Sequence, residues 1–123
     1  MKEISYIYSE AYAAGKLKHG TLSLTEEGTL VPAVSTQTAL YKKSLSNIVE
    51  VKFRGAFVLA VTNVDNTEIE KTADYVIYIP ETNPYFTDSL AIIPLQLFAY
   101  YESVGKGCDV DKPRNLAKSV TVE

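Results

Sequence analysis

The sequence has few of the residues that metal sites and disulfides need. It contains one cysteine, Cys108, and one histidine, His19, among 123 residues. A single cysteine excludes an internal disulfide and a cysteine-based zinc site, and we expect neither a metal nor a cofactor. The count leaves a cysteine–histidine nucleophile pair open. Nothing in GKGCDVDKP provides a reactive setting for the thiol, however, and we interpret Cys108 as structural or incidental.

A basic run, an arginine cluster and a long apolar segment are also missing. The formal net charge of −3 argues against a nucleic-acid partner and against binding to an anionic membrane surface. No apolar run approaches the roughly 20 residues of a membrane span, and MKEISYIYSE lacks the apolar centre of a signal peptide. We therefore predict a cytoplasmic protein.

The composition is sufficient for one folded domain. A hydrophobic content of 46% excludes a mainly disordered chain, and no repeat or linker divides the sequence. We expect a single domain over residues 1–123. Its last part, residues 108–123, includes DVDKPRNLAKSVTVE, which has neither a helical period nor a strand alternation. It is predicted to be an irregular polar tail.

Apolar periodicity predicts two helices in the first half. A helix over about residues 2–14, ending near Gly15, follows from the spacing of Ile4, Ile7, Tyr8, Ala11 and Ala14. After the short helical turn expected in TLSLTEE, the run TLVPAVS is typical of a strand, and its Pro32 favours a sheet edge. The next helix is predicted over about residues 38–54, with Gly55 as its stop and a buried face of Tyr41, Leu45 and Ile48.

The second half is more apolar. AFVLAVT and YVIYIP are unbroken apolar runs, which belong in a largely parallel sheet covered on both faces. The last helix is expected over about residues 87–104, and Pro94 is expected to kink it or delay its start. Its buried stripe is predicted to consist of Leu90, Ile93, Leu97, Phe98 and Tyr101.

These elements predict an α/β fold, a single open sandwich with a mostly parallel sheet flanked by helices on both faces. Ligands of such sheets lie beyond the carboxyl ends of the strands, here the loops around Ser35, Thr62 and Pro80. Fold alone assigns no chemistry. The nucleotide-binding and esterase glycine motifs are absent, and GKG lacks the residues that frame a phosphate loop, so we exclude nucleotide binding.

Two carboxylates on the expected first helix are candidates for proton transfer. At about 100° per residue, Glu3 and Glu10 fall within about 20° of each other, at one border of the apolar stripe. A partly desolvated carboxylate is a better proton acceptor near neutral pH. The alternative, that both are ordinary boundary residues in ion pairs, remains open.

One histidine and one lysine are the other candidates. His19 lies in the loop sequence LKHG, and imidazole suits proton shuttling near neutral pH, although the sequence alone favours a passive histidine. Lys118 lies in NLAKSV between Ala117 and Val120. A lysine held among apolar groups becomes a usable amine, whereas a lysine near a terminus is normally solvated.

Three stretches carry a family resemblance: KEISYIYSEAYAAGKLKHG, SNIVEVKFRG and IPLQLFAYYESVGKGCDVDKPRNLAKSVTVE. They span nearly the whole chain. The sequence resembles the C-terminal sugar isomerase (SIS) domain of the glucosamine-6-phosphate synthase family, the isomerizing glutamine:fructose-6-phosphate aminotransferases. That family typically ends in a string almost identical to DVDKPRNLAKSVTVE.

The resemblance implies an activity and partners. Family members make glucosamine 6-phosphate from fructose 6-phosphate and glutamine, the entry step of hexosamine and UDP-N-acetylglucosamine synthesis. Their chain has a glutaminase domain followed by two isomerase domains, and this sequence resembles the second. A homodimer is implied, because the LKHG histidine acts across the subunit boundary.

The resemblance also implies the site residues. Glu3 is the base that moves a proton between sugar carbons one and two, and His19 assists ring opening. Lys118 forms a Schiff base with the open-chain ketose before ammonia replaces it. The tail then acts as a lid anchored by Arg114 and Asn115, with Leu116 and Ala117 lining the site and Ala117 and Lys118 contacting substrate. Glu10 is expected to be structural.

Departures and alternatives follow from the same comparison. After LKHG the family usually has proline, where this chain has Thr21, which predicts a less preorganised loop. The phosphate-binding loops and the glutaminase cysteine of the family are missing, so we expect the chain alone to be inactive with glutamine and to bind fructose 6-phosphate weakly or not at all. A non-catalytic sugar-phosphate-sensing or dimerisation domain would not need Glu3, His19 and Lys118 together. A deglycase acting on phosphorylated amino sugars would not be expected to carry this tail.

Overall fold

The structure, a computed structural model, describes residues 1–114, without the side chain of His19. The chain divides into two compact units. Residues 12–92 form the first, called here the sheet unit. Residues 1–11 and the described residues from 93 onward form the second, called the terminal unit.

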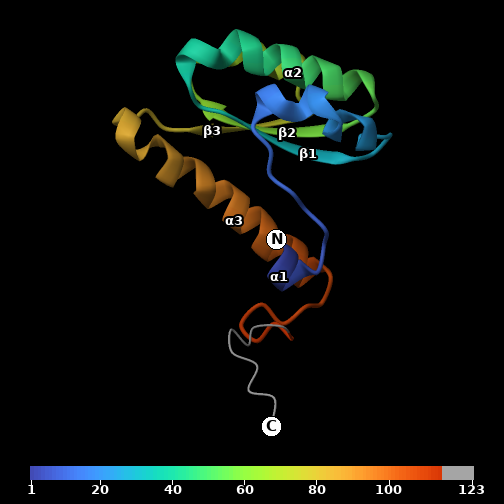
Figure 1. Cartoon of the computed structure of the whole chain (residues 1–123). Coiled ribbons are helices and arrows are strands. Elements are labelled where there is room, and N and C mark those ends of the chain that lie inside the picture. The colour runs from blue at the N-terminus through green and yellow to red at the C-terminus, as the bar shows by residue number, and fades with distance from the viewer. Residues whose placement is uncertain (115–123) are drawn as a thin grey trace. The chain divides into compact units, whose positions relative to one another are not determined.

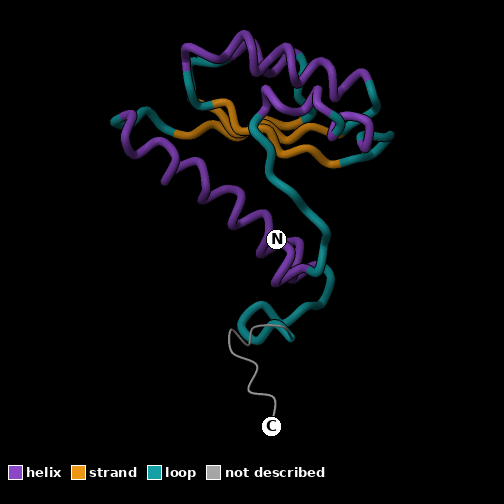
Figure 2. Tube along the Cα trace, in the orientation of Figure 1, coloured by secondary structure: helices purple, strands orange, loops and turns teal. Residues whose placement is uncertain are grey.

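The sheet unit is built on three parallel strands in the order β1-β2-β3. They are β1 (Leu30–Ser35), β2 (Phe57–Asn63) and β3 (Tyr75–Ile79), drawn side by side in Figures 1 and 2. The parallel sheet and the mixed α/β class are confirmed. Since β1 pairs only with β2 in the described sheet, the edge position that Pro32 favoured is also confirmed.

One face of the sheet packs against α2 (Tyr41–Phe53), which follows the 3₁₀ turn η3 (Thr38–Leu40). Together these elements confirm the helix predicted over residues 38–54, and Gly55 follows it with a φ of 87°. Of the predicted buried face, Ile48 is buried, whereas Tyr41 and Leu45 are only half-buried. The core beneath the helix consists of Ile48, Val51, Ala56, Val58, Ala60 and Ile69.

Short 3₁₀ segments complete the sheet unit: η1 (Ala14–His19), η2 (Thr21–Leu24), η4 (Thr67–Lys71) and η5 (Pro84–Phe86). The helical turn expected in TLSLTEE is confirmed as η2. Leu17 of η1 and Leu22 of η2 pack against the core, so these turns are held by apolar contacts as well as by their own hydrogen bonds.

The first helix is much shorter than predicted. Helix α1 spans Lys2–Ser5, and Tyr6 ends it in the left-handed conformation with a φ of 56°. The expectation of a helix to residue 14 is wrong, because residues 6–13 contain no helix. A left-handed residue interrupts the helical hydrogen-bond ladder, and the aromatic and β-branched residues Tyr6, Ile7 and Tyr8 resist helix formation weakly but consistently.

The last helix, α3, spans Thr87–Gly105 and confirms the predicted range to within one residue. It continues through Pro94, so a delayed start is wrong. Three residues of the predicted stripe are not buried, because Ile93, Leu97 and Tyr101 are 47%, 50% and 66% exposed, whereas Leu90 and Phe98 are half-buried. The buried residues of α3 are small, namely Ala91, Ala99 and Ser103, and small side chains let a neighbouring backbone approach closely. No helix within residues 1–114 has the length and apolarity needed to cross a bilayer.

Candidate functional site

The predicted base, Glu3, lies on α1 in the terminal unit with its side chain exposed. Partial burial of Glu3 and Glu10 on one helix face was predicted and is wrong. Glu10 lies beyond the end of α1, is exposed, and accepts a hydrogen bond from the Tyr8 hydroxyl. Glu3 is therefore open to an incoming molecule, whereas Glu10 is engaged locally.

Helix α1 is tied to the end of α3 by a long-range hydrogen bond. The ammonium group of Lys106 donates to the backbone oxygen of Ser5 at 2.8 Å, across 101 residues of sequence. Ser5 itself is buried, and its hydroxyl donates to the backbone oxygen of Met1 at 2.8 Å. Figure 1 shows α1 beside the final turns of α3. The helix that carries Glu3 is thus attached, through Ser5, to the residue that directly follows α3.

The first residues of the tail have a defined backbone. After Gly107, with a φ of 72°, the Cys108 N–H donates to the Ser103 carbonyl at 2.9 Å, which closes the end of α3. The carboxylate of Asp109 then accepts the N–H groups of Asp111 and Lys112, both at 3.0 Å. This turn directs the chain toward Pro113, which is buried.

Arg114 joins the tail to the residue that ends α1. Its backbone N–H donates to the Tyr6 hydroxyl oxygen at 2.9 Å, and its guanidinium carbon lies 3.9 Å from the centroid of the Tyr6 ring. Such a stacked cation is favourable, by about 0.5–1 kcal/mol at an exposed site. The contact agrees with the anchoring role expected for Arg114. Tyr6 was not singled out in the sequence, and no local pattern signals a partner so distant.

His19 is the last residue of η1, in the sheet unit. The backbone around it is held on both sides. Lys18 forms an ion pair with Glu50 of α2 at 2.5 Å, and Gly20 adopts a φ of 124° while its carbonyl accepts the Ser23 hydroxyl. The ion pair is largely solvated and contributes little by itself. The positive φ of Gly20 makes that residue hard to replace.

The predicted catalytic residues belong to different parts of the chain. Glu3 belongs to the terminal unit and His19 to the sheet unit. Lys118 and Ala117 lie outside the described residues, as do Asn115 and Leu116. Within residues 1–114, no group of three or more histidine, cysteine, aspartate or glutamate side chains is arranged to hold a metal ion.

A buried polar network lies at the carboxyl ends of β1 and β2. The Thr62 hydroxyl donates to the Ser35 carbonyl at 2.5 Å and accepts from the Asn66 amide at 2.9 Å. Asn63 donates to the Thr36 carbonyl at 2.9 Å. The Ser35 hydroxyl is buried with no partner in the described part of the chain. The loops around Ser35 and Thr62 were predicted, but the asparagines that complete the network were not.

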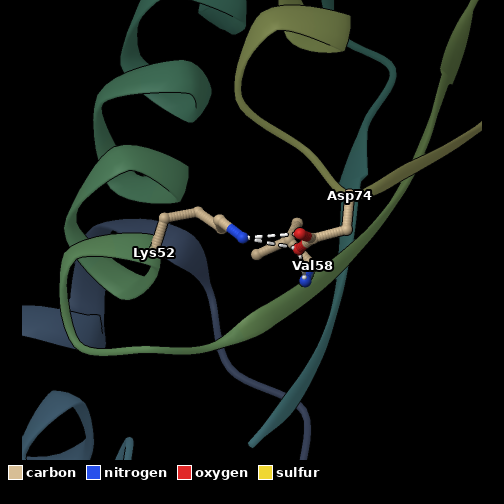
Figure 3. A network of polar contacts seen from close by, with 3 residues as sticks. All are labelled: Lys52, Val58 and Asp74. Atoms are coloured by element: carbon tan, nitrogen blue, oxygen red, sulfur yellow. Dashed lines mark hydrogen bonds and ion pairs between the residues drawn. The ribbon is translucent and has the colours of Figure 1, made fainter. Parts of the chain in front are cut away.

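A charged network, shown in Figure 3, lies at the amino ends of β2 and β3. Lys52 of α2 reaches the carboxylate of Asp74, which also accepts the Val58 N–H at 2.7 Å. The Lys52 ammonium and the Val58 N–H hold the pKa of Asp74 below its ordinary value. Because this cluster lies where β2 and β3 begin, away from the ligand-binding edge of a parallel sheet, we interpret it as structural.

Comparison with known proteins gives consistent matches. The family model described as the SIS domain matches residues 1–104. A glutamine–fructose-6-phosphate aminotransferase (isomerizing) of Caldanaerobacter subterraneus subsp. tengcongensis is 63% identical over all of this chain and 20% of its own length. The enzyme of the same description from Clostridium acetobutylicum is 58% identical over the same shares. The chain therefore spans about a fifth of the length of these relatives.

A solved structure matches the fold as well. It is the C-terminal domain of glucosamine-fructose-6-phosphate aminotransferase from Francisella tularensis. The TM-score is 0.78 and the sequence identity 34%, over 89% of this chain and 31% of that one.

Proposed function

Because the chain belongs to the SIS domain family, we propose that it is the C-terminal isomerase domain of an isomerizing glutamine–fructose-6-phosphate aminotransferase. The observation that carries this proposal is the 63% identity, over every residue of the chain, to an enzyme of that description. The parent enzyme then makes glucosamine 6-phosphate from fructose 6-phosphate and ammonia derived from glutamine.

The proposed chemistry divides between Lys118 and Glu3. The Lys118 amine attacks carbon two of the open-chain ketose, and loss of water gives a Schiff base. Ammonia adds at that carbon and releases the lysine. Glu3 removes a proton from carbon one and a proton is delivered to carbon two, which converts the imine into the amino aldose. The exposed carboxylate of Glu3 is consistent with direct access to a sugar.

The arrangement of the terminal unit supports this assignment. Contacts of Lys106 and Arg114 hold α3 and the start of the tail against the segment that contains Glu3. The described part of the tail therefore ends, at Arg114, in contact with Tyr6, three residues after the proposed base.

The remaining partners follow from the same proposal. His19 assists ring opening in the active site of a second subunit, which requires the parent enzyme to be a homodimer. We also assign this enzyme to the cytoplasm. The first isomerase domain supplies the phosphate-binding loops, and the glutaminase domain supplies ammonia. The chain without these companions binds fructose 6-phosphate weakly or not at all and does not use glutamine.

Borohydride trapping tests the proposal. The full-length parent enzyme is incubated with fructose 6-phosphate, reduced, digested and mapped by mass spectrometry. We expect one reduced sugar adduct on Lys118, which is absent from Lys118→Arg and retained in the matched control Lys112→Arg. A folded wild-type enzyme without an adduct on Lys118 contradicts the Schiff-base role and favours a domain that senses sugar phosphate or mediates dimerisation.

A further inference from the structure

We propose that Tyr6 is a positioning residue, which fixes the first residues of the C-terminal tail, as far as Arg114, against the end of the helix that carries Glu3. Its catalytic consequence rests on the proposed function. Its structural basis does not, because every contact involved lies within the described residues of the terminal unit.

Two independent contacts join Tyr6 to Arg114. The hydroxyl oxygen accepts the backbone N–H of Arg114 at 2.9 Å, and the guanidinium group stacks over the ring at 3.9 Å. The hydrogen bond fixes the backbone of residue 114, and the stacked guanidinium restricts its side chain. The two contacts use different parts of both residues, so they define an orientation as well as a distance.

The backbone of Tyr6 is itself unusual. Among the non-glycine residues within 1–114, only Tyr6 has a positive φ, which is 56°. A bulky residue in this region is held there against a local cost, by the structure around it. Ser5, the preceding residue, is the one whose carbonyl accepts Lys106 at 2.8 Å. The end of α1 is thus fixed on one side by α3 and on the other by the tail.

The position of Arg114 limits where the proposed nucleophile can go. Lys118 follows Arg114 by four positions, and an extended chain advances at most about 3.6 Å per residue, or roughly 14 Å over four steps. Tyr6 is three residues from Glu3 along the chain. In the proposed mechanism, an anchor at residue 114 limits the volume that Lys118 can sample, and confining two reacting groups increases the rate at which they meet.

The test compares Tyr6→Phe with Tyr8→Phe in the full-length parent enzyme. Tyr6→Phe keeps the ring and removes the oxygen that accepts Arg114. Tyr8→Phe removes a hydroxyl from the same segment, whose hydrogen bond goes to Glu10 and not to the described part of the tail. The readouts are hydrogen exchange of peptides that cover residues 109–114, the steady-state constants with fructose 6-phosphate, and the rate of adduct formation on Lys118.

We expect Tyr6→Phe to speed exchange at the Arg114 amide by about two- to tenfold, the effect of losing one hydrogen bond. We also expect kcat to fall about three- to tenfold with less than a twofold change in KM, since positioning and not binding is lost. Adduct formation should slow in parallel, and Tyr8→Phe should match the wild type.

Two results overturn the inference. Unchanged exchange in Tyr6→Phe shows that Tyr6 does not hold the tail, and faster exchange with unchanged kcat shows that the contact has no catalytic consequence. Failure of the proposed function gives a different result: the wild-type enzyme forms no adduct on Lys118. The exchange experiment still decides, in that case, whether Tyr6 fixes residue 114.

Discussion

The ammonium group of Lys52 donates two hydrogen bonds to the carboxylate of Asp74, at 2.6 and 2.8 Å. The same carboxylate accepts the Val58 N–H at 2.7 Å. One side chain just before β3 therefore joins helix α2 to the start of β2 (Figure 3). This charged network lies at the amino ends of the strands, whereas the neutral network of Thr62 and Asn66 lies at their carboxyl ends.

Replacing Asp74 should make the sheet unit less stable in a pH-dependent way. The Lys52 hydrogen bond, followed by the Val58 N–H, lowers the pKa of Asp74 from its ordinary value of 3.8. A carboxyl group with a lowered folded-state pKa stabilises the fold fully above its unfolded-state pKa, and that contribution is lost as the pH falls through the folded-state pKa. Asp74→Asn should therefore lower the Tm at pH 7, and the difference from wild type should shrink below about pH 4.

Thermal unfolding followed by circular dichroism from pH 7 to acid checks this expectation. The matched control is Asp65→Asn, since Asp65 is exposed and accepts one hydrogen bond from the Tyr41 hydroxyl. A Tm difference between Asp74→Asn and wild type that stays constant down to acid pH contradicts the linkage.

Replacing Thr62 should disrupt the carboxyl-edge network. Thr62→Val keeps the shape but leaves the Ser35 carbonyl and the Asn66 amide without their partner. A buried polar group without a partner costs about 1–3 kcal/mol, so we expect a loss of that order in the free energy of unfolding. Thr62→Ser, which keeps the hydroxyl, should cost less. Urea denaturation measures both, and equal losses would show that the hydroxyl contributes nothing.

Gly55 should not tolerate a side chain. Its φ is 87°, and a Cβ atom added there would lie 2.8 Å from the Cα atom of Glu27. Gly55→Ala combines backbone strain with a steric overlap, and we expect it to lower the free energy of unfolding by about 1–3 kcal/mol. The control is Gly105→Ala at the end of α3, where nothing lies within 4 Å of the added atom. A neutral Gly55→Ala in urea denaturation is the opposing outcome.

Glu3→Gln in the full-length parent enzyme should abolish most proton transfer. An amide cannot accept the proton, and loss of a general base typically lowers kcat by about 10²–10⁴-fold. Glu10→Gln should stay within about twofold of wild type, because Glu10 is exposed and engaged with Tyr8. Steady-state assays of glucosamine 6-phosphate formation compare the two. Equal activities of the two variants would remove Glu3 from the mechanism.

The core strands were predictable because their signal is local and strong. AFVLAVT and YVIYIP are unbroken apolar runs, and that pattern is typical of strands in a parallel sheet. Pro32 likewise restricts β1 to an edge because it lacks an N–H group. The first helix was not predictable in the same way. Its apolar spacing fits a helix, but the left-handed Tyr6 ends it after four residues.

The stripe of α3 was misplaced for a related reason. Periodicity identifies the large apolar residues of a helix but not the side against which its neighbours pack. In the structure the buried positions of α3 are Ala91, Ala99 and Ser103, while Leu97 and Tyr101 are exposed. Close packing selects small residues where backbones approach, and hydrophobicity alone does not report that distance.

The sequence by itself determined the parallel strands, the range of α2 and the family resemblance, because each depends on residues close together in the chain or on a long matching string. Only the tertiary structure decided that Arg114 lies against Tyr6 and that Asp74 reaches Lys52. These pairs are 108 and 22 residues apart. Contacts at such separations form only after the elements pack, when the burial of the core has already offset the entropy of closing the loops between them.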